Sequence, residues 1–259
     1  MDQDIIGLIP AGGKATRISP LPCSKELFPL GLYPTSDGGL RPKAVATYLL
    51  EDMRAGGADK AFIVIRQGKW DIPAYYGDGA MLNMHIGYLL MNVPYGPPYT
   101  LDQAYPFVQN NIVVMGFPDI LITPRDAFKD IVSELKSTSA DVVLGLFPTE
   151  FPHKWDPVDL ATDGRIVKVE IKPTQTSLKY VWAIAAWSPA FTQFMHEYLE
   201  HRRPEFETGN AREIIFSDIM QAAIDNGLHV RGVLFEDGSC LDVGTPNDLQ
   251  KALQTLYSV

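Results

Sequence analysis

Residues 5–29 read IIGLIPAGGKATRISPLPCSKELFP, an apolar run that leads directly into a loop with paired glycines. The run predicts a buried β-strand over residues 5–10, and the glycines predict the turn that follows. Because glycine has no side chain, backbone N–H groups in such a loop can approach phosphate oxygens closely. Arg17 and Lys25 would add positive charge, and Thr16 a hydroxyl donor. By itself the pattern fits a phosphate-binding loop or a plain turn with two exposed cations.

The glycine spacing excludes two common phosphate-binding motifs, since it matches neither GxxxxGK[ST] nor GxGxxG. Beyond the loop, the chain alternates between short apolar runs and helical patterns. Strands are expected at 61–65, 85–91, 112–115, 141–147 and 180–187, and helices at 42–54, 126–136, 190–201, 217–226 and 247–257. The Asp163-Gly164 pair predicts a hairpin turn. This alternation predicts an α/β fold, Rossmann-like with three α/β/α layers and a mixed, mainly parallel central sheet, in a single domain over residues 1–259.

Composition narrows the possible partners. The formal net charge is −9 and no run of basic residues is present, so we expect no binding to polymeric nucleic acid and none to a membrane. The two cysteines form no paired motif, acids precede the first apolar run, and no apolar run approaches about 20 residues. These features predict a cytoplasmic protein.

The glycine loop resembles the signature of the sugar-phosphate nucleotidyltransferases, GGxGTRLxPxTxxxPKxxxP. The matching residues are Gly12, Gly13, Thr16, Arg17, Pro20, Lys25 and Pro29. Two departures stand out: Ala15 replaces the third glycine, and the stretch from Arg17 to Lys25 is two residues shorter.

Four further segments resemble segments of the same family and follow in its order. They are YLLMNVPYG at 88–96 for YxxQxxPxG, VVMGFPDIL at 113–121 for a strand-end GD, VEIKP at 169–173 for VxEKP, and LDVGTPNDLQKA at 241–252 for DxGTPxxLxxA. The resemblance therefore covers nearly the whole chain.

The resemblance implies attack of a sugar-1-phosphate oxygen on the α-phosphorus of a nucleoside triphosphate, with Mg²⁺ as cofactor and pyrophosphate as leaving group. It implies Arg17 and Lys25 as catalytic cations, Asp119 and Asp242 as magnesium ligands, and a homo-oligomer. The acceptor would be held by Glu170 and Lys172. The nucleotide would be held by Ala11, Gly12, Gly13, Thr16, Met91, Pro94 and Gly96.

Several departures keep other functions open. Met91 stands where the family has a base-reading glutamine, Phe117-Pro118 is inserted before Asp119, and Ile171 separates Glu170 from Lys172. One alternative is a cytidylyltransferase that acts on phosphocholine, a phosphonate or another non-sugar phosphate. Another is a nucleotide-binding regulatory protein without turnover. Trp155, Trp182 and Trp187 are candidates for a sugar pocket, with core packing as the alternative.

Overall fold

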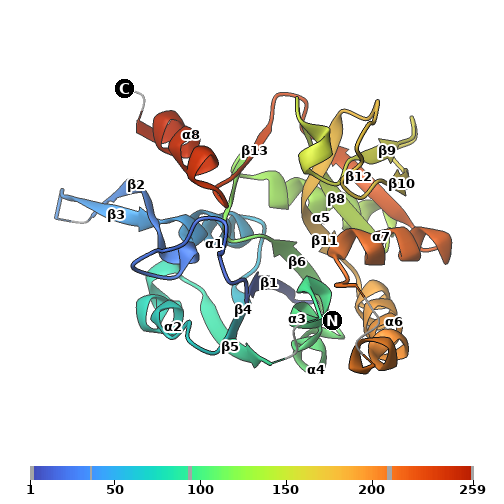
Figure 1. Cartoon of the computed structure of the whole chain (residues 1–259), viewed down its shortest axis with the longest axis horizontal. Coiled ribbons are helices and arrows are strands. Elements are labelled where there is room, and N and C mark those ends of the chain that lie inside the picture. Colours follow the sequence, from blue (N-terminus) through green and yellow to red (C-terminus); the bar gives the residue numbers. More distant parts are fainter. Residues whose placement is uncertain (1–2, 36, 93–94, 209–211, 258–259) are drawn as a thin grey trace.

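The computed structural model describes residues 3–35, 37–92, 95–208 and 212–257, which form a central sheet with helices around it (Figure 1). Within these residues, seven strands lie in the order β12-β8-β11-β6-β1-β4-β5. Their bounds are β1 Ile5–Ala11, β4 Lys60–Arg66, β5 His85–Met91, β6 Ile112–Gly116, β8 Val142–Pro148, β11 Tyr180–Trp187 and β12 Val230–Leu234. Strand β11 pairs antiparallel with β6 and β8, and the other pairs are parallel. The predicted mixed, mainly parallel sheet is confirmed.

Both faces of this sheet are covered by helices, because successive apolar side chains of the strands point to opposite sides. Leu8 and Ile9 of β1 belong to two different core clusters and are 0% and 1% exposed. One cluster contains side chains of α1 Val45–Ala55, α2 Asp71–Tyr76 and α5 Ala127–Thr138. The other contains side chains of α3 Pro97–Asp102, α4 Tyr105–Val108, α6 Pro189–Glu207 and α7 Phe216–Asp225. Burial of one such side chain stabilises the fold by about 1.5–3 kcal/mol, and the predicted three layers are confirmed.

Three two-stranded sheets complete the fold. They pair β2 Pro29–Pro34 with β3 Leu40–Ala44, β7 Ile120–Thr123 with β13 Ser239–Asp242, and β9 Val158–Leu160 with β10 Ile166–Val169. The last is the hairpin predicted at Asp163-Gly164, and Gly164 has the φ of +83° that such a turn favours. Helix α8 Pro246–Tyr257 packs against β2, at the base of the β2–β3 arm (Figure 1). Short 3₁₀ helices are η1 Lys25–Leu27, η2 Ala80–Leu82 and η3 Pro152–Lys154.

One predicted helix start is wrong. The pattern at 42–54 predicts a helix that begins at Pro42, but Pro42 lies in β3 opposite Leu32 of β2 and the helix begins at Val45. Proline is tolerated there because β3 is an edge strand. No helix in the described part of the chain is both long and apolar enough to cross a membrane.

Candidate active site

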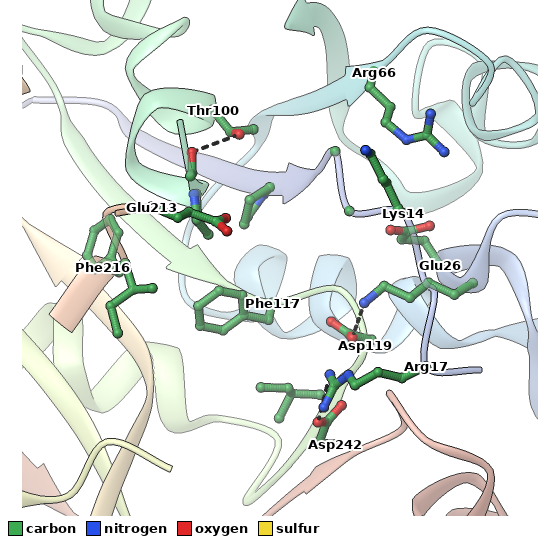
Figure 2. Close-up of a pocket in the computed structure, with 18 of the residues that line it drawn as sticks. Lys14, Arg17, Glu26, Arg66, Thr100, Phe117, Asp119, Glu213, Phe216 and Asp242 are labelled. Carbon is green, nitrogen blue, oxygen red and sulfur yellow. Dashed lines mark hydrogen bonds and ion pairs between the residues drawn. The ribbon is translucent and has the colours of Figure 1, made fainter. Parts of the chain in front are cut away.

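A cavity of about 810 Å³ lies at the carboxyl ends of β1, β4, β5 and β6. In open α/β sheets this is the edge where ligands bind, because the loops that leave the strands surround it. The loop after β1, the turn after β6 and the end of β13 all contribute side chains to the cavity wall (Figure 2).

The loop after β1 forms one side of the cavity through Gly12 and Gly13. A Cβ at Gly13 would meet no protein atom within 4 Å, so the space beside it is open. The loop turns at Ala15, whose carbonyl accepts from the N–H groups of Ile18 and Ser19 at 3.1 and 3.0 Å. Ala15 has a φ of +53°, the left-handed conformation for which the family signature supplies glycine. This conformation costs a residue with a Cβ about 1–2 kcal/mol.

Two cation–carboxylate pairs lie in this cavity. Lys25 donates from Nζ to the carboxylate of Asp119, and these side chains are 17% and 11% exposed. Arg17 Nη2 lies 3.8 Å from Asp242 Oδ2, and the Arg17 side chain is 66% exposed (Figure 2). Lys25 is therefore held in the wall, whereas Arg17 remains accessible to a ligand.

The β7–β13 sheet brings the two aspartates together. Asp242 pairs in register with Ile120, and the N–H of Val243 donates to the backbone carbonyl of Asp119 at 2.9 Å. The inserted Phe117-Pro118 forms a turn closed by the N–H of Ile120 and the carbonyl of Phe117 at 3.1 Å. The insertion therefore leaves Asp119 in the cavity wall.

The charge of Asp119 affects the ionisation of Asp242. Burial and the nearby charge of Asp119 raise the pKa of Asp242, although the N–H of Gly244, Arg17 and Lys25 act in the opposite direction. Burial by itself would lower the pKa of Lys25. The negative charges of Asp119, Glu26 and Asp242 outweigh burial, so the pKa of Lys25 is raised.

Two adjacent carboxylates are oxygen donors of the kind Mg²⁺ prefers. In the described residues, this cavity included, no group of three or more His, Cys, Asp or Glu side chains is arranged to hold a metal ion. Asp119 and Asp242 thus fit a cation whose remaining ligands come from phosphate and water.

Away from Asp119 and Asp242, the cavity is lined by Met91, Gly96 and Thr100. Gly96 has a φ of +119°, and a Cβ there would lie 2.0 Å from the carbonyl oxygen of Ile214, so this position requires glycine. A Cβ at Gly12 would lie 3.5 Å from the Met91 side chain, which places the glycine loop against this end. The predicted nucleotide residue Pro94 lies outside the described residues.

Three predicted ligand residues are not brought to the cavity wall. Ala11 is 1% exposed in the core of the sheet, and Thr16 is exposed in the loop turn. Glu170 pairs with Lys168 at 2.9 Å and accepts a hydrogen bond from Thr176. Strand β10 ends at Val169. From Glu170 onward, successive side chains therefore no longer point to alternate faces as they do in a strand.

Lys172, in contrast, does line the cavity. Its φ of +39° turns the chain, and its N–H donates to Asp156 Oδ1 at 3.1 Å. The extra residue Ile171 therefore separates the two predicted acceptor ligands: Lys172 faces the cavity and Glu170 does not.

Comparison with known proteins identifies the family of this chain. Residues 6–258 match the family described as "Nucleotidyl transferase". The chain belongs to the nucleotidyl transferase family. This membership confirms the resemblance seen in the glycine loop and the four later segments.

The chain has curated relatives named glucose-1-phosphate thymidylyltransferase. It is 26% identical to the one from Streptomyces griseus over 246 residues, which cover 93% of this chain and 63% of the relative. It is 24% identical to the one from Streptomyces antibioticus over 260 residues, 96% of this chain and 65% of the relative. The chain thus spans just under two thirds of the length of these relatives. A Bacillus anthracis protein solved in complex with sucrose shares the fold, with a TM-score of 0.83 and 18% identity over 98% of this chain and 96% of that one.

One wall of the cavity is aromatic, and of its rings the sequence offered Trp155 and Trp182 as candidates but not Phe117 or Phe216. Trp182 lies between Phe117 and Phe216, with ring centroids 5.9 and 5.7 Å away. These rings line the cavity together with Trp155, whereas Trp187 is fully buried in the core. The only sequence signal was the tryptophan content, which does not separate cavity from core. Arg66 and Lys14 also line the cavity. Neither is a defining residue of the five segments, so the sequence did not single them out.

Proposed function

We propose that this nucleotidyl transferase moves a nucleoside monophosphate from a nucleoside triphosphate to a sugar-1-phosphate, with release of pyrophosphate and a requirement for Mg²⁺. The observation that carries the proposal is the meeting of Lys25–Asp119 and Arg17–Asp242 in one cavity. The thymidylyltransferase names of the relatives support a sugar-phosphate acceptor.

The reaction requires two anions to approach each other, so charge compensation and alignment are its main demands. An oxygen of the acceptor phosphate, already ionised near neutral pH, forms a bond to the α-phosphorus. The bond from the α-phosphorus to the bridging oxygen breaks, and pyrophosphate leaves. The reaction needs no general base from the protein.

Lys25 and Arg17 supply the positive charge in this proposal. Lys25 is held in the wall, so it would contact the α-phosphate where the fifth bond forms. Arg17 is exposed and would close on the leaving phosphates. A well-placed donor of this kind contributes about 3–4 kcal/mol to transition-state stabilisation.

Asp119 and Asp242 would hold the magnesium ion, which supplies charge neutralisation to the triphosphate when bound. In the structure Lys25 and Arg17 form ion pairs with these carboxylates. Each cation would then have a phosphate oxygen as its partner once the carboxylates hold a divalent ion. The aromatic side chains of Trp155, Trp182, Phe216 and Phe117 that line the cavity would enclose the acceptor.

The test is pyrophosphate release from each of the common nucleoside triphosphates with a panel of acceptors. The panel contains several hexose-1-phosphates, phosphocholine, a phosphonate and a control without acceptor. We expect magnesium-dependent release with a hexose-1-phosphate. Release only with a non-sugar phosphate would favour the cytidylyltransferase alternative. Triphosphate binding without release, for every acceptor, would favour a regulatory protein.

A further inference from the structure

A second cavity of about 300 Å³ lies beside the first, on the other side of the loop after β1. It is bounded by the loop residues 13–15, 19 and 21–25 and by the turn that leaves β4. Gly13, Lys14, Lys25 and Arg66 line both cavities, so the two share a wall. Figure 2 shows Lys14 and Arg66 on the side of the main cavity away from Phe216.

Positive charge in this shared wall exceeds negative charge. Lys69, which lines the second cavity, forms an ion pair with Glu26 at 2.6 Å, and these side chains are 6% and 2% exposed. Lys25 is paired with Asp119. Asp71, the acid of the second cavity, accepts from the N–H and the hydroxyl of Ser24 at 2.6 and 2.7 Å.

Lys14 and Arg66 are the cations that remain. Among the ion pairs of the described residues, neither has a carboxylate partner. Burial lowers the pKa of Lys69, and repulsion from Lys25 and Arg66 adds to this effect although Glu26 opposes it. An anion placed between Lys14 and Arg66 would relieve this excess of positive charge.

Arg66 also has an unused hydrogen-bond donor. Its Nε is buried without an acceptor, and its Nη1 donates to the carbonyl of Gln67 at 3.3 Å. A buried donor without a partner costs free energy, so the Arg66 side chain is not fully satisfied in this position, and a small rotation toward a phosphate in the cavity would give it an acceptor. The planar guanidinium suits two oxygens of one phosphate group.

Arg66 lies close to the glycine loop, at the edge of the sheet where the cavity opens. Arg66 ends β4, which lies beside β1 in the sheet, and it pairs in register with Met91 of β5. It therefore lies next to the glycine loop on the edge where the cavity opens. Arg66 is outside all five segments that resemble the family, and Lys14 occupies the unspecified position of the loop signature.

We propose that Arg66 and Lys14 form the seat of the two terminal phosphates of the triphosphate, and hence of the pyrophosphate that leaves. This proposal rests on the proposed function. When the bond between the α-phosphorus and the bridging oxygen breaks, its electron pair stays on that oxygen, which becomes part of pyrophosphate. Arg66 and Lys14 would stabilise this added charge, and they would bind pyrophosphate in the reverse reaction.

The experiment is calorimetric titration of inorganic pyrophosphate with Mg²⁺ into the wild-type protein and three variants. Arg66→Gln should weaken pyrophosphate binding by at least about tenfold, which corresponds to about 1.4 kcal/mol. Lys14→Gln should weaken it by a smaller factor. Arg41→Gln is the matched control, because Arg41 is an exposed arginine of β3 outside both cavities. If Arg66→Gln does not fold, Lys14→Gln carries the test, since Lys14 is exposed.

Each outcome separates the seat from the proposed function. Unchanged pyrophosphate binding in Arg66→Gln and Lys14→Gln overturns the seat, even where the wild type turns over a triphosphate and an acceptor. Absence of pyrophosphate binding to the wild type also overturns it. Arg66-dependent pyrophosphate binding supports the seat, and if no triphosphate–acceptor pair then turns over, the proposed function fails while the seat stands.

Discussion

Asparagine substitutions at Asp119 and Asp242 should have different effects on stability, although both should stop magnesium-dependent turnover. Asp119 is the hydrogen-bonded partner of Lys25, and both side chains are largely buried. Asp242 instead has its pKa raised by burial and by Asp119, so its charge is unfavourable in the folded protein without ligand. Removal of the first carboxylate breaks an ion pair, whereas removal of the second relieves repulsion.

The magnitude for Asp119→Asn follows from the Lys25 contact. A hydrogen bond to a charged group contributes about 1.5–3 kcal/mol, and breaking a fully buried pair costs about 3–5 kcal/mol. Glu26 and Asp242 remain near Lys25 and compensate part of its charge, so the loss should be about 2 kcal/mol. For a chain of this size that loss lowers the thermal midpoint by about 4–8 °C.

The thermal midpoint of Asp242→Asn should equal or exceed that of the wild type. Asparagine keeps the Oδ1 atom that accepts the Gly244 N–H at 2.7 Å, so this turn contact survives. The sign of the pH dependence follows from the raised pKa. The folded wild type binds the Asp242 proton more tightly than the unfolded chain does, so it loses stability relative to the variant as pH rises from the ordinary value of 3.8 through the raised pKa.

The assay is thermal unfolding across pH, with pyrophosphate release measured on the same samples. Asp159→Asn is the control, because Asp159 is an exposed acid on β9 with no contact to the cavity wall. If Asp242→Asn lowers the midpoint as much as Asp119→Asn does, or if its difference from the wild type does not change with pH, the electrostatic reasoning is wrong.

Three further substitutions test other parts of the account. Arg17→Ala should lower kcat by about 10²–10³, with a stability change within about 1 kcal/mol, because its side chain is 66% exposed; near-normal rates would make the loop structural. Met91→Gln places a hydrogen-bonding amide beside Gly96 and Thr100, where we expect the base. It should change the kcat/KM selectivity among the nucleoside triphosphates by about tenfold. If the wild type and Met91→Gln show the same selectivity among the nucleoside triphosphates, the base binds elsewhere. Ala15→Gly should raise the thermal midpoint by relieving the φ of +53°, with a gain of up to about 1 kcal/mol after the entropy cost of glycine, and a lower midpoint would show that Ala15 is not strained.

The sequence predicted six of the seven strands of the central sheet because these strands are apolar runs, but it did not predict β12. The predicted bounds of 85–91 and 180–187 coincide with β5 and β11, which are apolar runs bounded by turn residues. The pairs β2–β3 and β7–β13 were not predicted. Residues such as Ser239–Asp242 have little strand pattern, and they become a strand because β7 offers them a partner.

The candidate site was predicted where a motif existed. Arg17, Lys25, Asp119 and Asp242 come together as the family resemblance implied, although the sheet that joins the two aspartates was not predicted. Glu170 does not line the cavity whereas Lys172 does, because one extra residue changes which side chain faces it. Arg66 was missed because a charged residue at a strand end carries no signal until the neighbouring loop is in place.

The central claim is that Asp119 and Asp242 hold one divalent ion against the triphosphate. The most direct test is the anomalous scattering of Mn²⁺, used in place of Mg²⁺, in crystals soaked with a nucleoside triphosphate. We expect one Mn²⁺ peak within ligand distance of both carboxylates and of a phosphate oxygen. A nucleotide bound with Mn²⁺ away from both aspartates would contradict the account.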